Sequence, residues 1–169
     1  MGNSDFDRRL FLGGVGGAVL CNGPAFGLTP IDPCPTDRVT ISGGFGTAAF
    51  NVDIAADEQT RARGLMHAPA MSLSRGMLFI YQRPQIMSFW MRNTLIELDM
   101  LFLDGFGVIQ HIHHRAKPLD ETAISGGDQL LTGVLEINGG LAQRLGIRRG
   151  DVLRHPAFIS QSEPWACGK

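Results

Sequence analysis

Short runs in which apolar and polar residues alternate follow one another along most of the chain. Thr47–Ile54 is the clearest of them, because Phe50, Val52 and Ile54 alternate with other residues as in a strand that buries one face. Glycine and proline separate many of the runs, which marks turns between strands. The other runs that we predict to be strands are Arg38–Ser42, Met77–Tyr81, Met87–Arg92, Leu98–Leu103, Val108–His113, Gln129–Ile137 and Val152–Ile159.

Local signals show how parts of this pattern fold. Asp104 and Gly105 lie between two apolar runs, which predicts a tight turn and a β-hairpin. Two short helices are predicted from their capping residues: Glu58–Gly64 after Asp57, and Gly139–Leu145 between Asn138 and Gly146. These elements together predict a mainly β fold, a compact antiparallel sandwich or barrel of about eight short strands with one or two short helices.

The first residues form a different kind of segment, which predicts export. Arg8 and Arg9 precede a weakly apolar stretch, Leu10–Leu20, that is too short to span a bilayer but suits a signal peptide. The two arginines, followed by Phe-Leu, resemble a twin-arginine signal, so we expect a periplasmic or secreted protein. The predicted organisation is a signal peptide at 1–27, an extended leader at 28–37, a single β domain at 38–160 and a C-terminal tail at 161–169.

Export changes what the cysteines imply, and the net charge of the chain limits the classes of partner that it can bind. Cys21 would leave with the signal peptide, and Cys34 and Cys167 would remain as an even pair in an oxidising compartment. This favours a disulfide, with two unpaired thiols as the alternative. The formal net charge of −1 argues against nucleic acid as a partner held by bulk charge. No apolar run reaches about 18 residues, so no stable membrane span is expected after removal of the signal.

Several sequence blocks occur in a characteristic order in the β domain. The most specific is Ser88–Thr94, which reads SFWMRNT. The others are Arg61–Met66, Gly76–Phe79, Leu98–Asp99, Phe102, Val134–Asn138, Gly140, Leu145–Ile147 and Gly150–Asp151. Together they resemble the domain-of-unknown-function 192 family, although the family often has a single histidine where this chain reads HIHHR. The resemblance implies a compact, mostly β fold that is frequently exported, and it implies no established activity.

The most specific block also supplies the first candidate site. Trp90, Arg92 and Asn93 combine an aromatic surface with polar groups, as in the wall of a ligand pocket. Such residues also commonly stabilise a core or a turn, and that alternative stays open. The candidate ligand-binding residues are Trp90, Arg92, Asn93, Asp99, Glu136 and Arg63.

Asp99 and Glu136 belong to this set because each lies in an apolar run, where a carboxylate needs a partner. For Asp99 we expect bonds to Arg92, Asn93 or backbone N–H groups. For Glu136 we expect an ion pair with Arg63 or Arg92. An alternative function is a hydrolase that uses Asp99 with Glu97 or with Glu136, since paired carboxylates can divide acid and base roles.

The histidines offer a second alternative. His111 and His113 share one face of a predicted strand, so they could hold copper or zinc with help from a third group, such as a methionine thioether. The protein would then be a metal-binding protein or a metal-dependent enzyme. An exposed polar strand face without any cofactor explains them equally well. Because catalytic motifs are lacking, the leading hypothesis is a non-enzymatic domain that binds a small molecule or a periplasmic protein.

Overall fold

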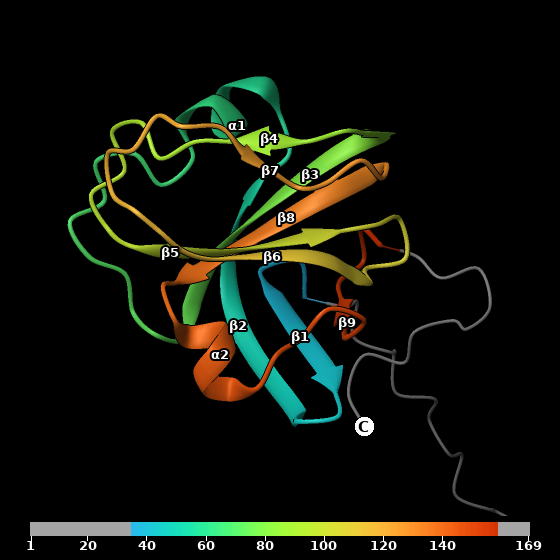
Figure 1. The fold of residues 1–169 in the computed structure, drawn as a ribbon. Coiled ribbons are helices and arrows are strands. Elements are labelled where there is room, and N and C mark those ends of the chain that lie inside the picture. Colours follow the sequence, from blue (N-terminus) through green and yellow to red (C-terminus); the bar gives the residue numbers. More distant parts are fainter. Residues whose placement is uncertain (1–34, 159–169) are drawn as a thin grey trace, which may run out of the picture. The chain divides into compact units, whose positions relative to one another are not determined.

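The computed structural model describes residues 35–158 (Figure 1). This part of the chain is mainly β, as the sequence predicts. The predicted signal peptide, the three cysteines and the C-terminal tail lie outside the described residues. Between residues 35 and 158, no helix is long and apolar enough to cross a membrane.

A curled seven-stranded sheet forms the body of the domain. Its strands in spatial order are β6 (Ile109–Ala116), β5 (Leu98–Leu103), β8 (Leu131–Asn138), β3 (Arg75–Gln85), β2 (Gly46–Ala55), β1 (Arg38–Gly43) and β9 (Val152–Arg154). The curl brings the two outer strands together, because Val108 pairs with Val152 and the Leu153 N–H donates to the Gly107 oxygen at 2.8 Å. The sheet is therefore a half-barrel.

One strand pairing departs from the antiparallel prediction. β2 and β3 run parallel, with Asn51–Ala55 beside Arg75–Phe79, so the sheet is mixed. A parallel pair needs a crossover connection between its strands. Here the crossover consists of α1 (Glu58–Arg63) and the loop of residues 64–74. Residues of this crossover line a hollow on the surface of the domain.

The sheet carries an apolar cluster on each face. The first cluster includes Leu101 and Leu135 and extends to α2 (Leu141–Leu145). The second cluster includes Phe102 and Val134, and it also contains residues from a two-stranded sheet of β4 (Ser88–Phe89) and β7 (Ile124–Ser125). Figure 1 shows α1, β4 and β7 on one side of the large sheet and α2 on the other. Successive residues of a strand alternate between the two faces, and therefore between the clusters.

Both predicted helices occur, but only the first is capped as predicted. Asp57 caps α1 by accepting a backbone N–H of the first turn. Gly146 ends α2 in the left-handed conformation, with φ of 81°, as expected. Asn138 does not cap α2, because its side-chain amide donates to the backbone oxygen of Ser72. The capping carboxylate instead comes from Asp99 in another strand.

The predicted strand Met87–Arg92 is shorter than expected. Only Ser88 and Phe89 form β4, paired with the two residues of β7. The chain then leaves the strand at Trp90, and Asn93 takes a left-handed conformation with φ of 54°. Trp90 and Arg92 therefore lie outside β4, and the prediction of a strand that extends to Arg92 is wrong.

Candidate functional site

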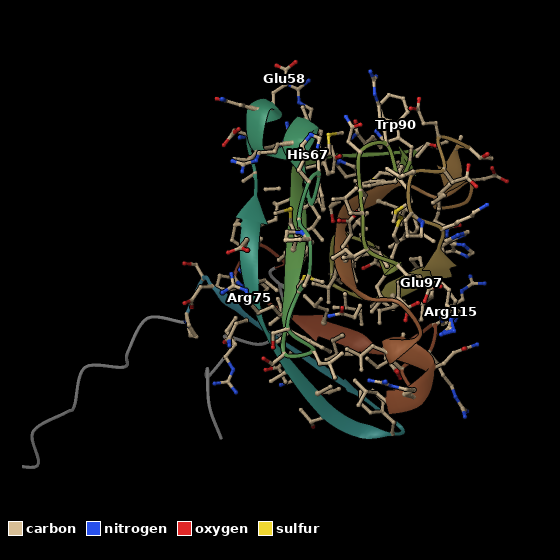
Figure 2. The ribbon with its side chains drawn as sticks, turned by 90° about the vertical axis from the view of Figure 1, so that its left-hand side faces the viewer. Glu58, His67, Arg75, Trp90, Glu97 and Arg115 are labelled. Carbon is tan, nitrogen blue, oxygen red and sulfur yellow. The ribbon has the colours of Figure 1, made fainter. Side chains whose placement is uncertain are left out.

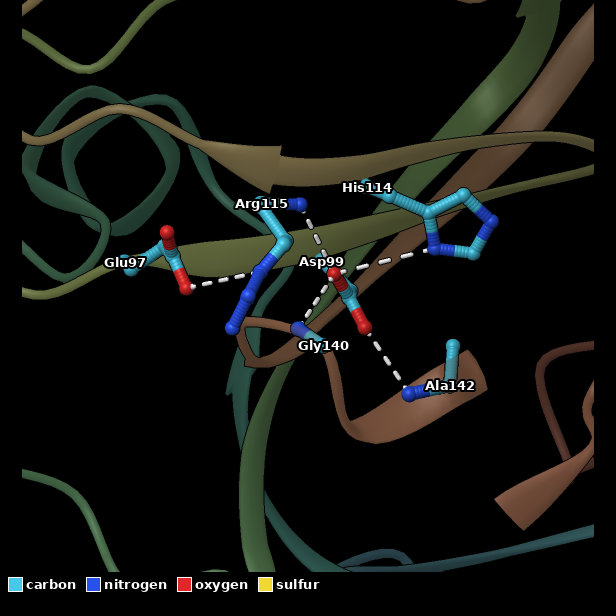
Figure 3. Close-up of polar contacts among 6 residues, drawn as sticks. All are labelled: Glu97, Asp99, His114, Arg115, Gly140 and Ala142. Carbon is cyan, nitrogen blue, oxygen red and sulfur yellow. Dashed lines mark hydrogen bonds and ion pairs between the residues drawn. The ribbon is translucent and has the colours of Figure 1, made fainter. Parts of the chain in front are cut away.

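Asp99 is fully buried in β5, where β6 and α2 meet (Figure 3). One carboxylate oxygen accepts the backbone N–H groups of Arg115 and Gly140, each at 2.8 Å, and the other accepts the N–H of Ala142 at 2.8 Å. The first N–H groups of a helix have no partner inside the helix. Asp99 therefore caps α2 from a distant part of the chain, and its hydrogen-bond partners are backbone groups rather than side chains of the SFWMRNT block. Nδ1 of His114 lies 3.8 Å from the oxygen that accepts from Arg115 and Gly140 (Figure 3).

A β-bulge supports this arrangement. His114 and Arg115 of β6 both lie opposite Asp99, so two residues face one. Arg115 has a left-handed backbone, with φ of 55°, and its N–H reaches the Asp99 carboxylate. Its Nε lies 3.4 Å from Oε2 of Glu97. Protein groups thus engage both carboxylates of the Asp99–Glu97 hydrolase alternative.

Glu136 and Asp99 point to opposite faces of the sheet. The register between β5 and β8 pairs Asp99 with Ile137 and Met100 with Glu136. Residues that lie directly opposite each other share a face. Ile137 belongs to the first apolar cluster and Met100 to the second. The sheet therefore separates the two carboxyl groups, and the structure does not form the Asp99–Glu136 pair of the hydrolase alternative.

Glu136 is a buried residue, 4% exposed. Its carboxyl group makes no hydrogen bond or ion pair with any of residues 35–158, although its oxygens are not among the fully enclosed side-chain atoms there that lack a partner. The expected ion pair with Arg63 or Arg92 is therefore absent from the described part. Burial raises the pKa of Glu136 to about 8, because an apolar environment disfavours the charged form. Such perturbed carboxyl groups are frequent at functional sites.

His111 and His113 do lie on the same face of β6. They are paired in register with Phe102 and Met100 of β5. The His111 ring packs 5.7 Å from the Phe102 ring, and partial burial followed by the neighbouring His113 lowers the pKa of His111. In the described part of the chain, no three side chains of histidine, cysteine, aspartate or glutamate are grouped so that they could hold a metal ion.

The SFWMRNT block and the loop after α1 meet in space. The backbone N–H of His67 donates to the backbone oxygen of Asn93 at 2.8 Å. The side-chain Nδ2 of Asn93 lies 4.0 Å from Sδ of Met66. His67, like Asn93, has a left-handed backbone, with φ of 63°. Figure 2 shows His67 and Trp90 near the same end of the domain. Two of the sequence blocks, RARGLM and SFWMRNT, are thus brought together.

A surface hollow of about 450 Å³ opens beside this junction. It lies between α1, the loop after it and parts of β2 and β3. Arg63 is exposed in its wall, and its guanidinium makes no hydrogen bond or ion pair with any residue in 35–158. Asp53 is already paired with Arg75 at 2.7 Å. The residues that line it include Asp53, Arg63, Leu65, Met66, His67 and Met77.

Trp90 and Arg92 stand on the surface next to the junction. Trp90 is 51% exposed, and the Arg92 guanidinium lies 5.8 Å from the centre of its ring. Nε of Arg92 is 4.0 Å from the carboxylate of Glu121. The six candidate residues therefore do not form one site. Arg63 lines the hollow and Asn93 belongs to the junction beside it. Trp90 and Arg92 are not among the residues that line the hollow, and Asp99 and Glu136 are buried on opposite faces of the sheet.

Sequence reasoning missed a third loop at this end of the domain. The backbone N–H of Leu119 donates to the backbone oxygen of Thr94 at 3.1 Å, so the loop between β6 and β7 contacts the SFWMRNT block. Leu119 is 59% exposed and left-handed, with φ of 62°. A leucine in this conformation is a rare outlier, and no local pattern in the sequence announces it.

This backbone conformation leads to a stability prediction. Leu119→Gly is expected to raise the free energy of unfolding by about 1 kcal/mol, because glycine removes the strain of a left-handed leucine. The larger conformational entropy that glycine has in the unfolded chain offsets only part of this gain. Urea denaturation of both proteins measures the change. Leu73→Gly is the matched control, since Leu73 is also exposed in a loop but is not among the residues with positive φ, and it should lower the stability. A loss at Leu119 as large as at Leu73 would contradict the strain.

Comparison with known proteins agrees with this fold. A candidate transcription regulator from Sinorhizobium meliloti 1021 is 36% identical, with a TM-score of 0.68 over 71% of this chain and 93% of its own. A protein of unknown function from Novosphingobium aromaticivorans DSM 12444 is 37% identical, with a TM-score of 0.68 over 84% of this chain and 99% of its own. No curated protein matches the chain. Residues 39–155 match the model of a family described as uncharacterised ACR, and the chain therefore belongs to the domain-of-unknown-function 192 family.

Proposed function

We propose that this domain binds, without catalysing a reaction, a small molecule that has an anionic group and an apolar part, and that the ligand occupies the hollow beside α1. The observation that carries the proposal is Arg63. This residue lines the hollow, and its guanidinium has no hydrogen-bond or ion-pair partner in the described range. Guanidinium groups bind carboxylates and phosphates through paired, charge-assisted hydrogen bonds.

The rest of the hollow supports a partly apolar ligand. Leu65 and Met77 line the hollow and also pack against the second apolar cluster, so this part of its wall is fixed by contacts with the core. Asp53 is the acidic lining residue that could neutralise Arg63, but it is engaged by Arg75. The volume of about 450 Å³ lies in the range of small-molecule sites.

The placement of the carboxyl groups supports binding over catalysis. A hydrolase that divides the acid and base roles between two carboxyl groups needs both groups to reach one substrate. Asp99 is occupied by three backbone N–H groups, and Glu136 lies on the opposite face of the sheet. Neither carboxylate lines the hollow.

The proposal predicts that Arg63 controls the affinity for an apolar anion. Anilinonaphthalene sulfonate is a suitable probe, since it joins an aromatic body to one negative charge. Arg63→Gln should weaken its binding about tenfold, the effect of losing one charge-assisted hydrogen bond. Fluorescence titration gives the affinity, and amide chemical shifts show where the probe sits, with the largest changes expected at 63–68.

Arg83→Gln is the matched control, because Arg83 is also exposed and without a partner in the described part but lies outside the hollow. It should leave the affinity unchanged. Equal losses for the two variants would mean that the probe responds only to net charge. Chemical shift changes centred away from the loop after α1 would assign the binding to another surface.

A further inference from the structure

A second hollow, of about 310 Å³, lies along the outer edge of β6. On one side β6 pairs with β5, and on its other side, beyond Ile109, it has no strand neighbour in the described part of the chain. The turn between α2 and β9 faces this free edge, and its Gly150 N–H donates to the backbone oxygen of Ile109 at 2.8 Å. The residues that line the hollow are His111, Ile112, His114, Ile147, Arg148 and Arg149.

The hollow brings together two segments that are rich in basic residues. His111 and His114 belong to the HIHHR segment of β6, and Arg148 and Arg149 belong to the turn after α2. No acidic residue of the described part lines the hollow. A hollow lined by groups of one sign concentrates ions of the opposite sign. Its chemistry therefore points to an anion.

The two arginines are available to such an anion. Both are exposed, and their guanidinium groups make no hydrogen bond or ion pair with any residue in 35–158. Asp151, the acidic residue of the turn, is engaged elsewhere. One of its carboxylate oxygens accepts the backbone N–H of Arg148 at 2.8 Å, and the other lies so close to Gly43 of β1 that a Cβ there would be 1.9 Å from it.

Positive groups surround His111 at one end of the hollow. Partial burial lowers the pKa of His111, and the charges of His113, Arg149 and His114 lower it further. The guanidinium of Arg149 therefore lies near this ring, although the two residues come from different elements. The aromatic ring that contacts His111, that of Phe102, carries no charge to compensate. An anion between Arg149 and His111 would relieve the repulsion.

His114 is oriented by the buried carboxylate of Asp99. Its Nδ1 lies 3.8 Å from that carboxylate, and Figure 3 shows the other ring nitrogen pointing away from Asp99. This second nitrogen, Nε2, has no hydrogen-bond partner in the described part. A protonated imidazole donates from both nitrogens. His114 can therefore face Asp99 with one nitrogen and donate to a ligand with the other.

We propose that this hollow binds a diphosphate group, either free or as the ester of a small molecule. Arg148 and Arg149 supply the charge-assisted hydrogen bonds that arginine forms with phosphate, and His111 and His114 donate from the strand. A diphosphate fits better than a single phosphate, because three residue steps along a strand separate His111 from His114 by roughly 10 Å. The site goes beyond the proposed function and does not depend on it, since Arg63 lines the other hollow.

The test is an NMR titration of the full chain with inorganic pyrophosphate, without divalent cations and at an ionic strength held constant with sodium chloride. The largest amide shift changes are expected at 111–114 and 147–150. The ring signals of His111 should show that its pKa rises when pyrophosphate is bound, because the anion counteracts the neighbouring positive charges. Inorganic phosphate should bind at least tenfold more weakly, since it reaches fewer of the donors.

ADP carries the same group as an ester, and it should change the same signals. Tighter binding of ADP would assign the site to diphosphate esters, and tighter binding of pyrophosphate would assign it to the free anion. These titrations use the unaltered chain, so they decide the case whether or not any variant folds.

Variants separate the site from the net charge of the protein. Arg148→Gln and Arg149→Gln should each weaken pyrophosphate binding about tenfold, the effect of losing one charge-assisted hydrogen bond. Arg144→Gln is the matched control, because Arg144 is exposed in the last turn of α2, has no side-chain partner in the described part and does not line the hollow. It should leave the affinity unchanged, as should Arg63→Gln.

Four results would overturn the proposal. They are the absence of binding, shift changes centred on 63–68, equal losses for Arg144→Gln and Arg149→Gln, and an affinity for phosphate that matches the affinity for pyrophosphate. Because the anilinonaphthalene sulfonate titration addresses residues 63–68, this inference and the proposed function can fail separately.

Discussion

Asp99→Ala is expected to lower the free energy of unfolding by about 4 kcal/mol. The substitution removes an acceptor that is fully buried and that holds the backbone N–H groups of Arg115, Gly140 and Ala142. A hydrogen bond to a charged group contributes about 1.5–3 kcal/mol, and the contributions of bonds that share one carboxylate are not additive. The loss also leaves the start of α2 uncapped and the bulge of β6 unsupported.

Urea denaturation of Asp99→Ala and of the wild-type protein measures this effect. Asp53→Ala is the control, because Asp53 is exposed and its ion pair with Arg75 should contribute no more than about 1 kcal/mol. Amide hydrogen exchange adds a local readout, since the N–H groups of Gly140 and Ala142 should lose protection first. A loss at Asp99 no larger than at Asp53 would show that Asp99 is not structural, and it would reopen a catalytic role.

Local sequence signals predicted the elements whose contacts are local. The hairpin of β5 and β6 follows from Asp104, whose carboxylate accepts the N–H groups of Phe106 and Val108 within the turn itself. The cap of α1 by Asp57 is equally local. Each of these interactions joins residues at most four positions apart, so the residue types at those positions carry the information.

Contacts between distant segments could not be predicted in this way. Asp99 and Gly140 are separated by 41 positions, and the cap of α2 depends on their meeting. Asn138 looked like the capping residue because it stands next to the helix. The parallel pairing of β2 with β3 likewise depends on how the crossover folds back, and no alternation within either strand distinguishes it from an antiparallel pair.

The candidate site shows the same limit. Asp99 and Glu136 both stood out as carboxylates in apolar runs, but their roles follow from the register of β5 and β8. A shift of one residue would place both on the same face, because side chains alternate along a strand. The hollow next to Arg63 arises only when α1 and the loop after it fold back beside β2 and β3, and no pattern within these segments indicates that arrangement.

Glu136→Gln is expected to remove a strong pH dependence of stability. The pKa of Glu136 is about 8 in the folded protein, because burial disfavours its charged form, against an ordinary value of 4.5 in the unfolded chain. Between these two values the folded state keeps a proton that the unfolded chain has released. Folding therefore binds a proton, and the stability of the wild-type protein falls as the pH rises from 4.5 to about 8 and then levels off.

Glutamine imitates the neutral carboxyl group, so the variant should match the wild-type protein near pH 4.5 and exceed it in stability above about pH 8 by on the order of 5 kcal/mol. Urea denaturation across this range gives the difference, and background titrations cancel because both proteins share them. Glu97→Gln is the control, since Glu97 is exposed and paired with Arg115, and it should change stability by less than about 1 kcal/mol at any pH. If Glu136→Gln and the wild-type protein keep a constant difference across the range, Glu136 ionises in the folded state as it does in the unfolded chain. Its carboxylate would then have to be reached by water or by a partner that holds the charge.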